Sequence, residues 1–206
     1  MSNYVVHFTH GGEQENDYEN IISICYNMVL RPKRAFGIGT KFAPDKLSQQ
    51  AVCFSEIPPG AWHRLSERRK TSYGIGFTKK FIQSQGGGQI WYVDKGSPHR
   101  AAIQRMMKNS INDPKADVWK LTPMIDAPGT YSSGPYYFEW EREWRHVGPL
   151  EFKPRDVAFL LIPEKLHGIA RTFFEDAEHG NYGPAYLCPY VDPKWPRQRI
   201  LAALKS

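Results

Sequence analysis

Carboxylates recur at every second position within residues 136–147, the stretch YYFEWEREWRHV. Side chains alternate between the two faces of a strand, so Glu139, Glu141 and Glu143 would share one face with Arg145. Like charges side by side on a strand are unfavourable unless solvent or a cation offsets them. Two interpretations remain open. The stretch is a solvated edge strand whose charges discourage aggregation, or it lines a cleft in which a carboxylate does chemistry and Arg145 or a substrate cation balances the charge.

A second polar group stands near the N-terminus, in the segment YVVHFTHGG at 4–12. Apolar residues lead into His7, Phe8 and Thr9, and two glycines then end the run. This pattern fits an edge strand that frays into a turn. It also fits a binding site at the end of a strand.

Other catalytic and metal-binding patterns are missing from the sequence. It contains no GxxxxGK[ST] phosphate loop, no GxSxG elbow and no HExxH zinc motif. Cys25, Cys53 and Cys188 are far apart and odd in number, which argues against a zinc site and a disulfide framework. We therefore expect no bound metal ion. A nucleophile pair formed by a cysteine and a histidine remains an open alternative.

Composition indicates a globular chain. The 206 residues are 41% hydrophobic, which suits a single domain over 1–206 with a substantial core. No apolar run reaches the roughly 20 residues that span a bilayer, and the N-terminus lacks a signal-peptide pattern, so we expect a cytoplasmic protein without a membrane partner. The net charge of +6, concentrated at 31–34, 64–70 and 100–108, fits either a polyanion partner or an ordinary basic surface.

The patterns of apolar residues predict alternating short strands and helices. Asn16 and Asp17 can cap a helix over 18–30, and the glycines of YGIGF (73–77) indicate that another backbone or a ligand approaches closely. The segment that follows the prolines at 58–59 and runs to Lys70 is basic and polar, and we predict no helix or strand there. Further helices are predicted at 79–83, 99–111, 164–178 and the C-terminus, and strands at 4–9, 51–55, 73–77, 89–93, 136–147 and 157–162. This order predicts an α+β fold.

The order of the segments resembles that of a known superfamily. A His-Phe-Thr strand is followed by ENIISI (19–24), VCFSEIP (52–58), YGIGF, IWYV and EREWR (141–145). This series resembles the ADP-ribosyltransferase superfamily, in a bacterial phage-defence branch that includes the DarT-type nucleic-acid ADP-ribosyltransferases, and it also resembles the AbiGi-type abortive-infection proteins. The resemblance covers about 4–162. It departs at Asn27, where the family often has a glycine, and it has no counterpart at 94–135.

The resemblance implies an ADP-ribosyltransferase-like split β-sheet core with inserted helices, and NAD as co-substrate. It implies that the dinucleotide binds at seven residues: His7, Phe8, Thr9, Asn20, Phe54, Ser55 and Tyr73. His7 would contact the adenosine-side ribose or a diphosphate oxygen, and Thr9 would hold the nicotinamide end. Without the resemblance, Phe54 reads as a core residue and Asn20 as a helix-start residue.

The resemblance also implies catalytic roles on the carboxylate strand. Glu143 would stabilise the oxocarbenium-like transition state in which nicotinamide leaves the ribose. Glu141 would orient or deprotonate the acceptor, and Glu139 could replace either. Arg145 would keep these carboxylates ionised.

The implied acceptor is nucleic acid, with RNA favoured over single-stranded DNA. In the superfamily, the segment before the catalytic strand selects the acceptor. Here that segment, 122–137, carries Tyr131, Tyr136 and Tyr137, which could stack on unpaired bases. The chain would then act as a phage-defence toxin restrained by an antitoxin protein. A non-catalytic AbiGi-like antitoxin that inhibits a partner is the alternative, and a protein-directed transferase or an NAD glycohydrolase is a third.

Overall fold

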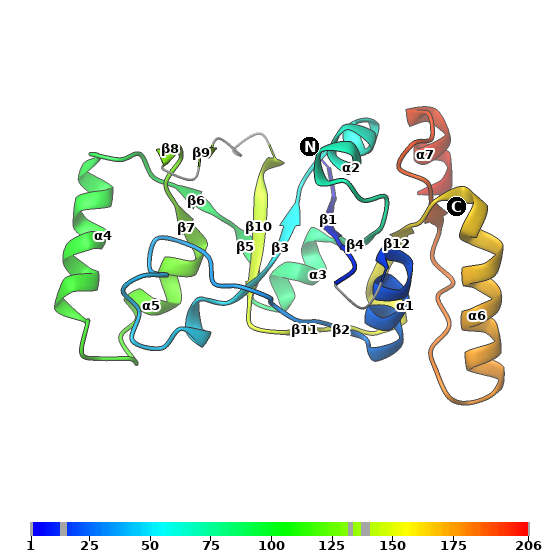
Figure 1. The fold of residues 1–206 in the computed structure, drawn as a ribbon, viewed down its shortest axis with the longest axis horizontal. Coiled ribbons are helices and arrows are strands. Elements are labelled where there is room, and N and C mark those ends of the chain that lie inside the picture. Colours follow the sequence, from blue (N-terminus) through cyan, green and yellow to red (C-terminus); the bar gives the residue numbers. More distant parts are fainter. Residues whose placement is uncertain (1, 13–15, 132–133, 137–140, 206) are drawn as a thin grey trace. The chain divides into compact units, whose positions relative to one another are not determined.

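The structure is a computed structural model that describes residues 2–12, 16–131, 134–136 and 141–205 (Figure 1). The chain forms two compact units that interleave along the sequence. The first unit comprises 1–30, 56–81 and 151–206, and the second comprises 31–55 and 82–150. The expected single domain over 1–206 stays a prediction.

Four strands of the first unit lie side by side in the order β13, β12, β4, β1. β1 (Tyr4–Phe8) pairs antiparallel with β4 (Gly74–Thr78), and β4 pairs antiparallel with β12 (Val157–Leu161). β13 (Tyr190–Val191) is parallel to β12. The predicted strands at 4–9, 73–77 and 157–162 are thus confirmed to within a residue of their ends.

The first helix begins where the sequence predicts. The Asn16 side chain accepts a hydrogen bond from the backbone N–H of Glu19, whose carboxylate accepts one from the N–H of Asn16. This capping box satisfies two amides that have no partner within a helix. The helix, α1 (Asp17–Asn27), ends before the predicted residue 30 because Met28 adopts a left-handed conformation (φ 53°). β2 (Val29–Leu30) follows.

The remaining helices of the first unit lie in its two later segments. A one-turn 3₁₀ helix (Pro59–Ala61) leads into α2, and others (Pro154–Asp156 and Glu164–Leu166) precede β12 and α6. The α-helices are α2 (Trp62–Arg69), α6 (His167–His179) and α7 (Arg197–Ala203). The sequence alone indicates the α2 segment only as a basic, polar stretch. Its buried face consists mainly of Trp62 and Leu65, three positions apart. Two apolar residues among several arginines are too few to show the periodicity of an amphipathic helix.

The core of the first unit packs against one face of β1. Val6 and Phe8 belong to one buried cluster with Trp62 of α2 and Phe159 of β12, and the Trp62 and Phe159 rings stack at 4.6 Å. Gly76 of β4 makes room for Phe159, since a Cβ there would lie 2.2 Å from that ring. The close approach of another backbone, predicted from the YGIGF glycines, is confirmed at Gly74, where a Cβ would lie 2.9 Å from the carbonyl oxygen of His7.

The second unit contains three antiparallel strands in the order β3, β10, β5. They are β3 (Ala51–Ser55), β10 (Glu143–Val147) and β5 (Gly88–Gln89). The predicted strand at 89–93 is divided at Ile90, so that β6 (Trp91–Tyr92) pairs with β7 (Ile125–Asp126) instead. β8 (Gly129–Tyr131) pairs antiparallel with β9 (Gly134–Tyr136).

Helices of the second unit cover a separate core. α4 (Pro98–Asn109), capped by Ser97, and α5 (Val118–Leu121) contribute Ile103, Met107 and Trp119 to it. One-turn 3₁₀ helices lie at Leu47–Gln49 and Thr122–Met124.

Two elements, α3 (Lys79–Ser84) and β11 (Leu150–Glu151), lie across the division between the units. Helices and a mixture of parallel and antiparallel strands make the chain consistent with the expected α+β class. Within the described residues, no helix is both long and apolar enough to cross a bilayer.

Candidate functional site

β10 places Glu143 and Arg145 on one face of a strand. Its register against β3 sets Glu143 opposite Ser55 and Arg145 opposite Cys53. The predicted alternation therefore holds for these two side chains. It brings the first carboxylate of the strand next to a guanidinium two residues later.

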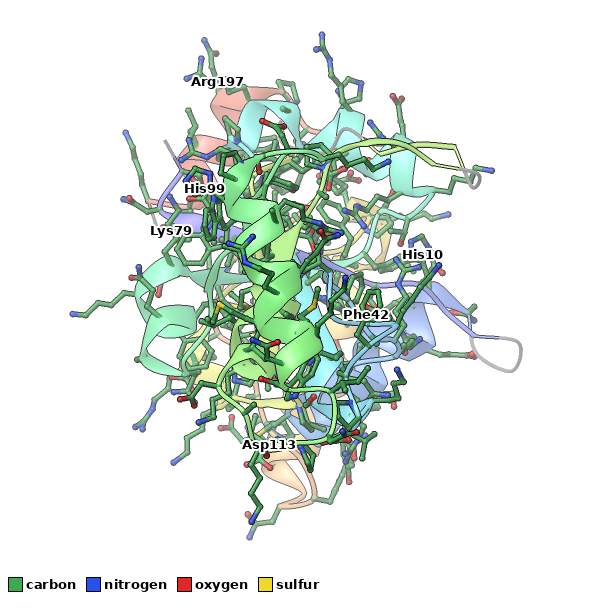
Figure 2. All side chains as sticks on the ribbon, turned by 90° about the vertical axis from the view of Figure 1, so that its left-hand side faces the viewer. His10, Phe42, Lys79, His99, Asp113 and Arg197 are labelled. Carbon is green, nitrogen blue, oxygen red and sulfur yellow. The ribbon has the colours of Figure 1, made fainter. Side chains whose placement is uncertain are left out.

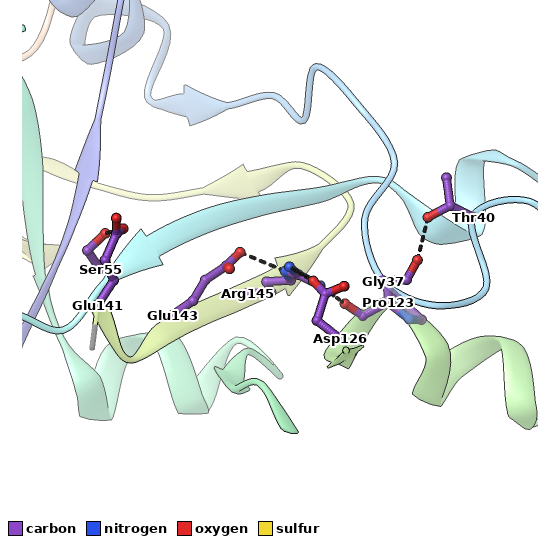
Figure 3. A network of polar contacts seen from close by, with 8 residues as sticks. All are labelled: Gly37, Thr40, Ser55, Pro123, Asp126, Glu141, Glu143 and Arg145. Carbon is purple, nitrogen blue, oxygen red and sulfur yellow. Dashed lines mark hydrogen bonds and ion pairs between the residues drawn. The ribbon is translucent and has the colours of Figure 1, made fainter. Parts of the chain in front are cut away.

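Arg145 is the centre of this polar network (Figure 3). Its side chain is completely buried, yet Nε donates to Oε1 of Glu143 at 2.8 Å and Nη1 donates to the carbonyl oxygen of Pro123 at 2.7 Å. Nη2 donates to Oδ2 of Asp126, and the guanidinium lies 4.8 Å from the centre of the Phe36 ring. A buried cation is tolerated only when its charge and its N–H groups are satisfied, and here two carboxylates and a carbonyl do so.

The charges of this network hold Glu143 in place. Burial alone would lower the pKa of Arg145, but Glu143 and Asp126 raise it above its usual value, so the guanidinium stays charged. Burial, and then the nearby charge of Glu143, raise the pKa of Cys53 well above the usual range of a thiol, so Cys53 is neutral. The Glu143 side chain keeps 13% of its surface exposed. Its carboxylate is thus fixed in position on a side chain that is not completely buried.

Glu141 does not share the strand with Glu143. Arg142 has φ 47°, a left-handed conformation, so the alternation expected over 136–147 is broken before β10 begins. Glu141 is buried and accepts a hydrogen bond from the Ser55 hydroxyl at 3.1 Å (Figure 3). The expectation that Glu141 and Glu143 lie on one strand face is therefore wrong, although both lie beside Ser55.

Some predicted residues lie outside the part of the chain that the structure describes. Glu139 and Tyr137 belong to the segment 137–140, which is not described. Of Tyr131 and Tyr136 only the backbone is described, in β8 and β9.

A second polar group lies in the first unit, at the end of β1. Nδ2 of Asn20 on α1 donates to the Thr9 hydroxyl and to the carbonyl oxygen of His10. The Thr71 hydroxyl donates to the carbonyl oxygen of Thr9 at 2.8 Å. The backbone N–H of Thr9 donates to the carbonyl oxygen of Tyr73 at 3.1 Å. The structure thus brings together three of the predicted NAD-binding residues, Thr9, Asn20 and Tyr73.

Aromatic rings border this group. The rings of Tyr73 and Tyr18 lie 6.3 Å apart and are tilted by 58°. Partial burial raises the pKa of both phenols, and the charge of Asp17 raises that of Tyr73 further. Both tyrosines are therefore neutral hydrogen-bonding groups at neutral pH.

The other predicted NAD-binding residues are placed differently. His7 is half-buried, opposite Ile75 in the register of β1 and β4. Phe8 packs into the core of the first unit, and Phe54 is almost completely buried in β3. These two rings have the core positions that alternation along a buried strand produces.

Two cavities are present, and the first shares Tyr18 with the border of the group at the end of β1. One of about 430 Å³ in the first unit is lined by α1 and Phe173, and includes Tyr18. Another of about 590 Å³ in the second unit is lined by Trp119, Lys115 and their neighbours. Neither is lined by Glu143, Thr9 or Asn20.

Sequence reasoning missed Asp126 and Thr71. Asp126 reaches Arg145 from β7, and Thr71 fastens the end of β1. The signal that could have pointed to Asp126 is the need of a buried arginine for a second carboxylate. No local pattern says which of the acidic residues supplies it.

The chain was compared with family models, curated proteins and solved structures, and no match was found in any of the three. In the described ranges, no group of three or more His, Cys, Asp or Glu side chains is arranged to hold a metal ion.

Proposed function

We propose that this chain is an NAD-dependent mono-ADP-ribosyltransferase that modifies nucleic acid, RNA or single-stranded DNA. The observation that supports this most is the pairing of Glu143 with the buried Arg145, which fixes a carboxylate on a side chain that is not completely buried. The resemblance of the sequence to DarT-type and AbiGi-type proteins is the second support, and it extends to an ADP-ribosyltransferase-like split sheet.

The chemistry requires a fixed negative charge. The bond between C1′ of the ribose and the nicotinamide nitrogen breaks, its electron pair stays on nicotinamide, and positive charge develops on the ribose. A nucleophile of the acceptor then forms the new bond to C1′ and loses its proton to solvent. Glu143 would stabilise the developing charge and accept a hydrogen bond from the 2′-hydroxyl. Because Arg145 already holds the carboxylate, little reorganisation is needed as the charge appears.

Glu141 has a different role in this proposal. The residue is only 3% exposed, and its carboxylate accepts a hydrogen bond from the Ser55 hydroxyl. We therefore assign it a positioning role at the start of β10, in place of direct contact with the acceptor. Ser55 acts with it and lies opposite Glu143 in the register.

Recognition of NAD is assigned to the polar group at the end of β1. Thr9 and Asn20 offer a hydroxyl and an amide that are already oriented by each other, and Tyr73 adds an aromatic ring. Such a flat, partly polar surface suits the ribose and the nicotinamide ring. His7 contributes on the same strand, and Phe8 supports the end of β1 from the core of the first unit, whereas Phe54 is buried in β3 of the second unit.

The biological role follows from the resemblance alone. We propose a toxin of a phage-defence toxin–antitoxin system, with a protein antitoxin as partner. The net charge of +6 is compatible with a nucleic-acid acceptor.

The test uses NAD labelled on its adenylate phosphate, with cell extract and either the wild-type protein or Glu143→Gln. Products are divided among RNase, DNase and protease digestions. The proposal predicts label that a nuclease releases, with the wild type only. Label that only protease releases, or NAD loss without any labelled product, would contradict it.

A non-catalytic antitoxin is the second candidate. It is favoured by one observation: Asn20 bonds Thr9, and Ser55 bonds Glu141, as in a purely structural role. Intact NAD after incubation with active, folded protein, together with capture of one defined partner toxin, would support this interpretation.

A further inference from the structure

The cavity of about 430 Å³ in the first unit is bordered by exposed aromatic rings. It is lined by residues of α1 and by Phe173 of α6. Tyr26 and Phe173, which both line it, are each 40% exposed. A single exposed apolar side chain is ordinary on a protein surface, whereas a hollow lined by several of them marks a binding surface. The volume of this cavity is also within the range of ligand sites.

α1 contributes an apolar stripe to the cavity. Tyr18, Ile22 and Tyr26 line it and follow one another at intervals of four residues, so their side chains lie in a row along one side of the helix. The residues that α1 buries are Ile21 and Cys25, which belong to a different side. The stripe is therefore apolar surface in addition to the part of α1 that the fold itself buries.

α6 supplies the other wall of the cavity. Ile169, which is 60% exposed, precedes Phe173 by four residues and lies on the same side of the helix. The Phe173 ring meets the buried Phe174 ring edge-on, with 5.3 Å between their centres. The Tyr26 hydroxyl donates to the carbonyl oxygen of Tyr182 at 2.6 Å. Both exposed rings are therefore held in place before anything binds to them.

The charges around the cavity are negative. Glu19 lines it, and Asp176 follows Phe173 by three residues on the same side of α6. α1 contains no Lys or Arg, and the guanidinium of Arg171 on α6 lies over the Tyr190 ring, 4.2 Å from its centre. The whole chain has a net charge of +6, so this border is opposite in sign to the rest of the protein. Charge complementarity therefore favours a positively charged partner.

An amphipathic helix is the occupant that this shape and these charges favour. Apolar side chains at intervals of three and four residues on such a helix fit an apolar groove lined by two helices. We propose that the cavity and its border form a docking site for an amphipathic helix of a partner protein, with Lys or Arg on both sides of its apolar face. The cations of this helix meet Glu19 and Asp176.

The docking site adjoins the group at the end of β1. Tyr18 lines the cavity, and its ring also lies 6.3 Å from that of Tyr73. A docked helix therefore lies next to the residues to which NAD recognition is assigned. That the partner is the antitoxin rests on the proposed function. The docking site itself rests only on the cavity, its rings and its carboxylates.

The test uses three fluorescein-labelled peptides of 14 residues. The first has seven leucines on one side of a helix and seven lysines on the other. The second has glutamate in place of each lysine, and the third has the composition of the first with leucine and lysine in alternation. Each peptide is titrated with the full chain in the absence of NAD, and anisotropy is read at 50 and 200 mM NaCl.

Phe173→Ala and Tyr26→Ala remove the two exposed rings. Each is expected to raise the Kd of the leucine–lysine helix about tenfold, the effect of losing one central contact of an interface. Phe42→Ala removes a phenyl ring that is 48% exposed in the second unit (Figure 2) and is the matched control. It is expected to change the Kd less than about twofold. Thermal unfolding shows that each variant is folded.

Glu19→Gln and Asp176→Asn remove the two carboxylates. Glutamine at position 19 can still complete the capping box of α1, so the start of the helix is preserved. Each change is expected to raise the Kd about 1.5- to 5-fold at 50 mM NaCl and less at 200 mM, as for an exposed ion pair. Glu178→Gln is the charge control, because it lies five residues after Phe173 and so on another side of α6. The leucine–glutamate and alternating peptides are expected to bind about tenfold or more weakly than the leucine–lysine helix.

Equal affinities for the two helical peptides, or for the helical and alternating lysine peptides, would overturn the inference. A wild-type chain that binds no peptide would do so too, as would a folded Phe173→Ala chain that binds within about twofold of wild type. A dimer of the chain in light scattering that Phe173→Ala dissociates would also overturn it, because a second copy would then cover the groove.

The two proposals fail separately. Peptide binding that requires Phe173, by a chain that transfers nothing from NAD, contradicts the proposed function and keeps the docking site. Transfer from NAD by a chain that binds no helical peptide contradicts the docking site and keeps the function.

Discussion

Arg145 donates a hydrogen bond from Nε to Oε1 of Glu143 at 2.8 Å, from a position two residues later on the same strand. The same guanidinium bonds Asp126 of β7 and the carbonyl oxygen of Pro123. One buried cation therefore fixes the carboxylate on which the proposed function depends, and its removal has consequences for both stability and activity.

Replacement of Arg145 by methionine is expected to destabilise the chain by about 3–5 kcal/mol, since it leaves Glu143 and Asp126 without their shared cation. Urea denaturation followed by circular dichroism measures this. Asp126→Asn is the matched control and is expected to destabilise the chain less, because Arg145 keeps its ion pair with Glu143. A destabilisation below about 1 kcal/mol for Arg145→Met would contradict the network as described.

Gly76→Ala is expected to cost about 1–3 kcal/mol, because the added Cβ would lie 2.2 Å from the Phe159 ring. The control is Gly168→Ala, near the start of α6, where nothing lies within 4 Å of the added carbon. This change is expected to be neutral or slightly stabilising, since alanine favours helix. Equal midpoints of thermal unfolding for the two variants would refute the close approach of β4 and Phe159.

Alkaline pH is expected to destabilise the first unit. Burial raises the pKa of Cys188 to about 12, from an ordinary value near 9, and burial also raises the pKa of Cys25 well above its ordinary value. The unfolded chain therefore loses these protons first as pH rises above about 9. Stability is present in full below that pH and falls between about pH 9 and 12.

Urea midpoints at pH 8, 9, 10 and 11 measure this fall. Cys188→Ala removes one of the titrating thiols and should flatten the decline, after correction for its loss of stability at pH 8. A slope identical to that of the wild type would show that Cys188 is not kept protonated by burial.

Asn20→Ala is expected to raise the KM for NAD about tenfold, because it removes the amide that orients Thr9 and faces the dinucleotide in the proposed function. Asn27→Ala removes an amide from the same helix, where it bonds only the Ser23 carbonyl one turn earlier. It should leave KM unchanged. Initial rates of NAD consumption at varied NAD concentration measure both, and an equal effect of the two variants would remove Asn20 from the site.

Local patterns in the sequence predicted many of the elements. β3 has its predicted bounds, and Asn16 caps α1 through Glu19 as its position indicates. These features depend on neighbours a few residues away. α2 was missed because two buried residues, Trp62 and Leu65, stand among many cations, and their burial depends on Phe159 far along the chain.

The candidate site was predictable only where one strand contains it. The pairing of Glu143 with Arg145 follows from alternation along β10. The position of Glu141 does not, because the left-handed backbone at Arg142 turns the chain before the strand begins. Asp126 could not be predicted, since it reaches Arg145 through the pairing of β7 with β6, which joins distant segments of the chain.

The catalytic role of Glu143 is tested by comparing transfer from labelled NAD to RNA by the wild type, Glu143→Gln and Asp126→Asn, all shown to be folded. Both variants remove one carboxylate from Arg145, but only Glu143 is proposed to meet the ribose. Transfer is expected to fall about 10²- to 10³-fold for Glu143→Gln, the effect of removing one preorganised electrostatic group, and much less for Asp126→Asn. Equal reductions in the two variants, or undiminished transfer by Glu143→Gln, would contradict this role.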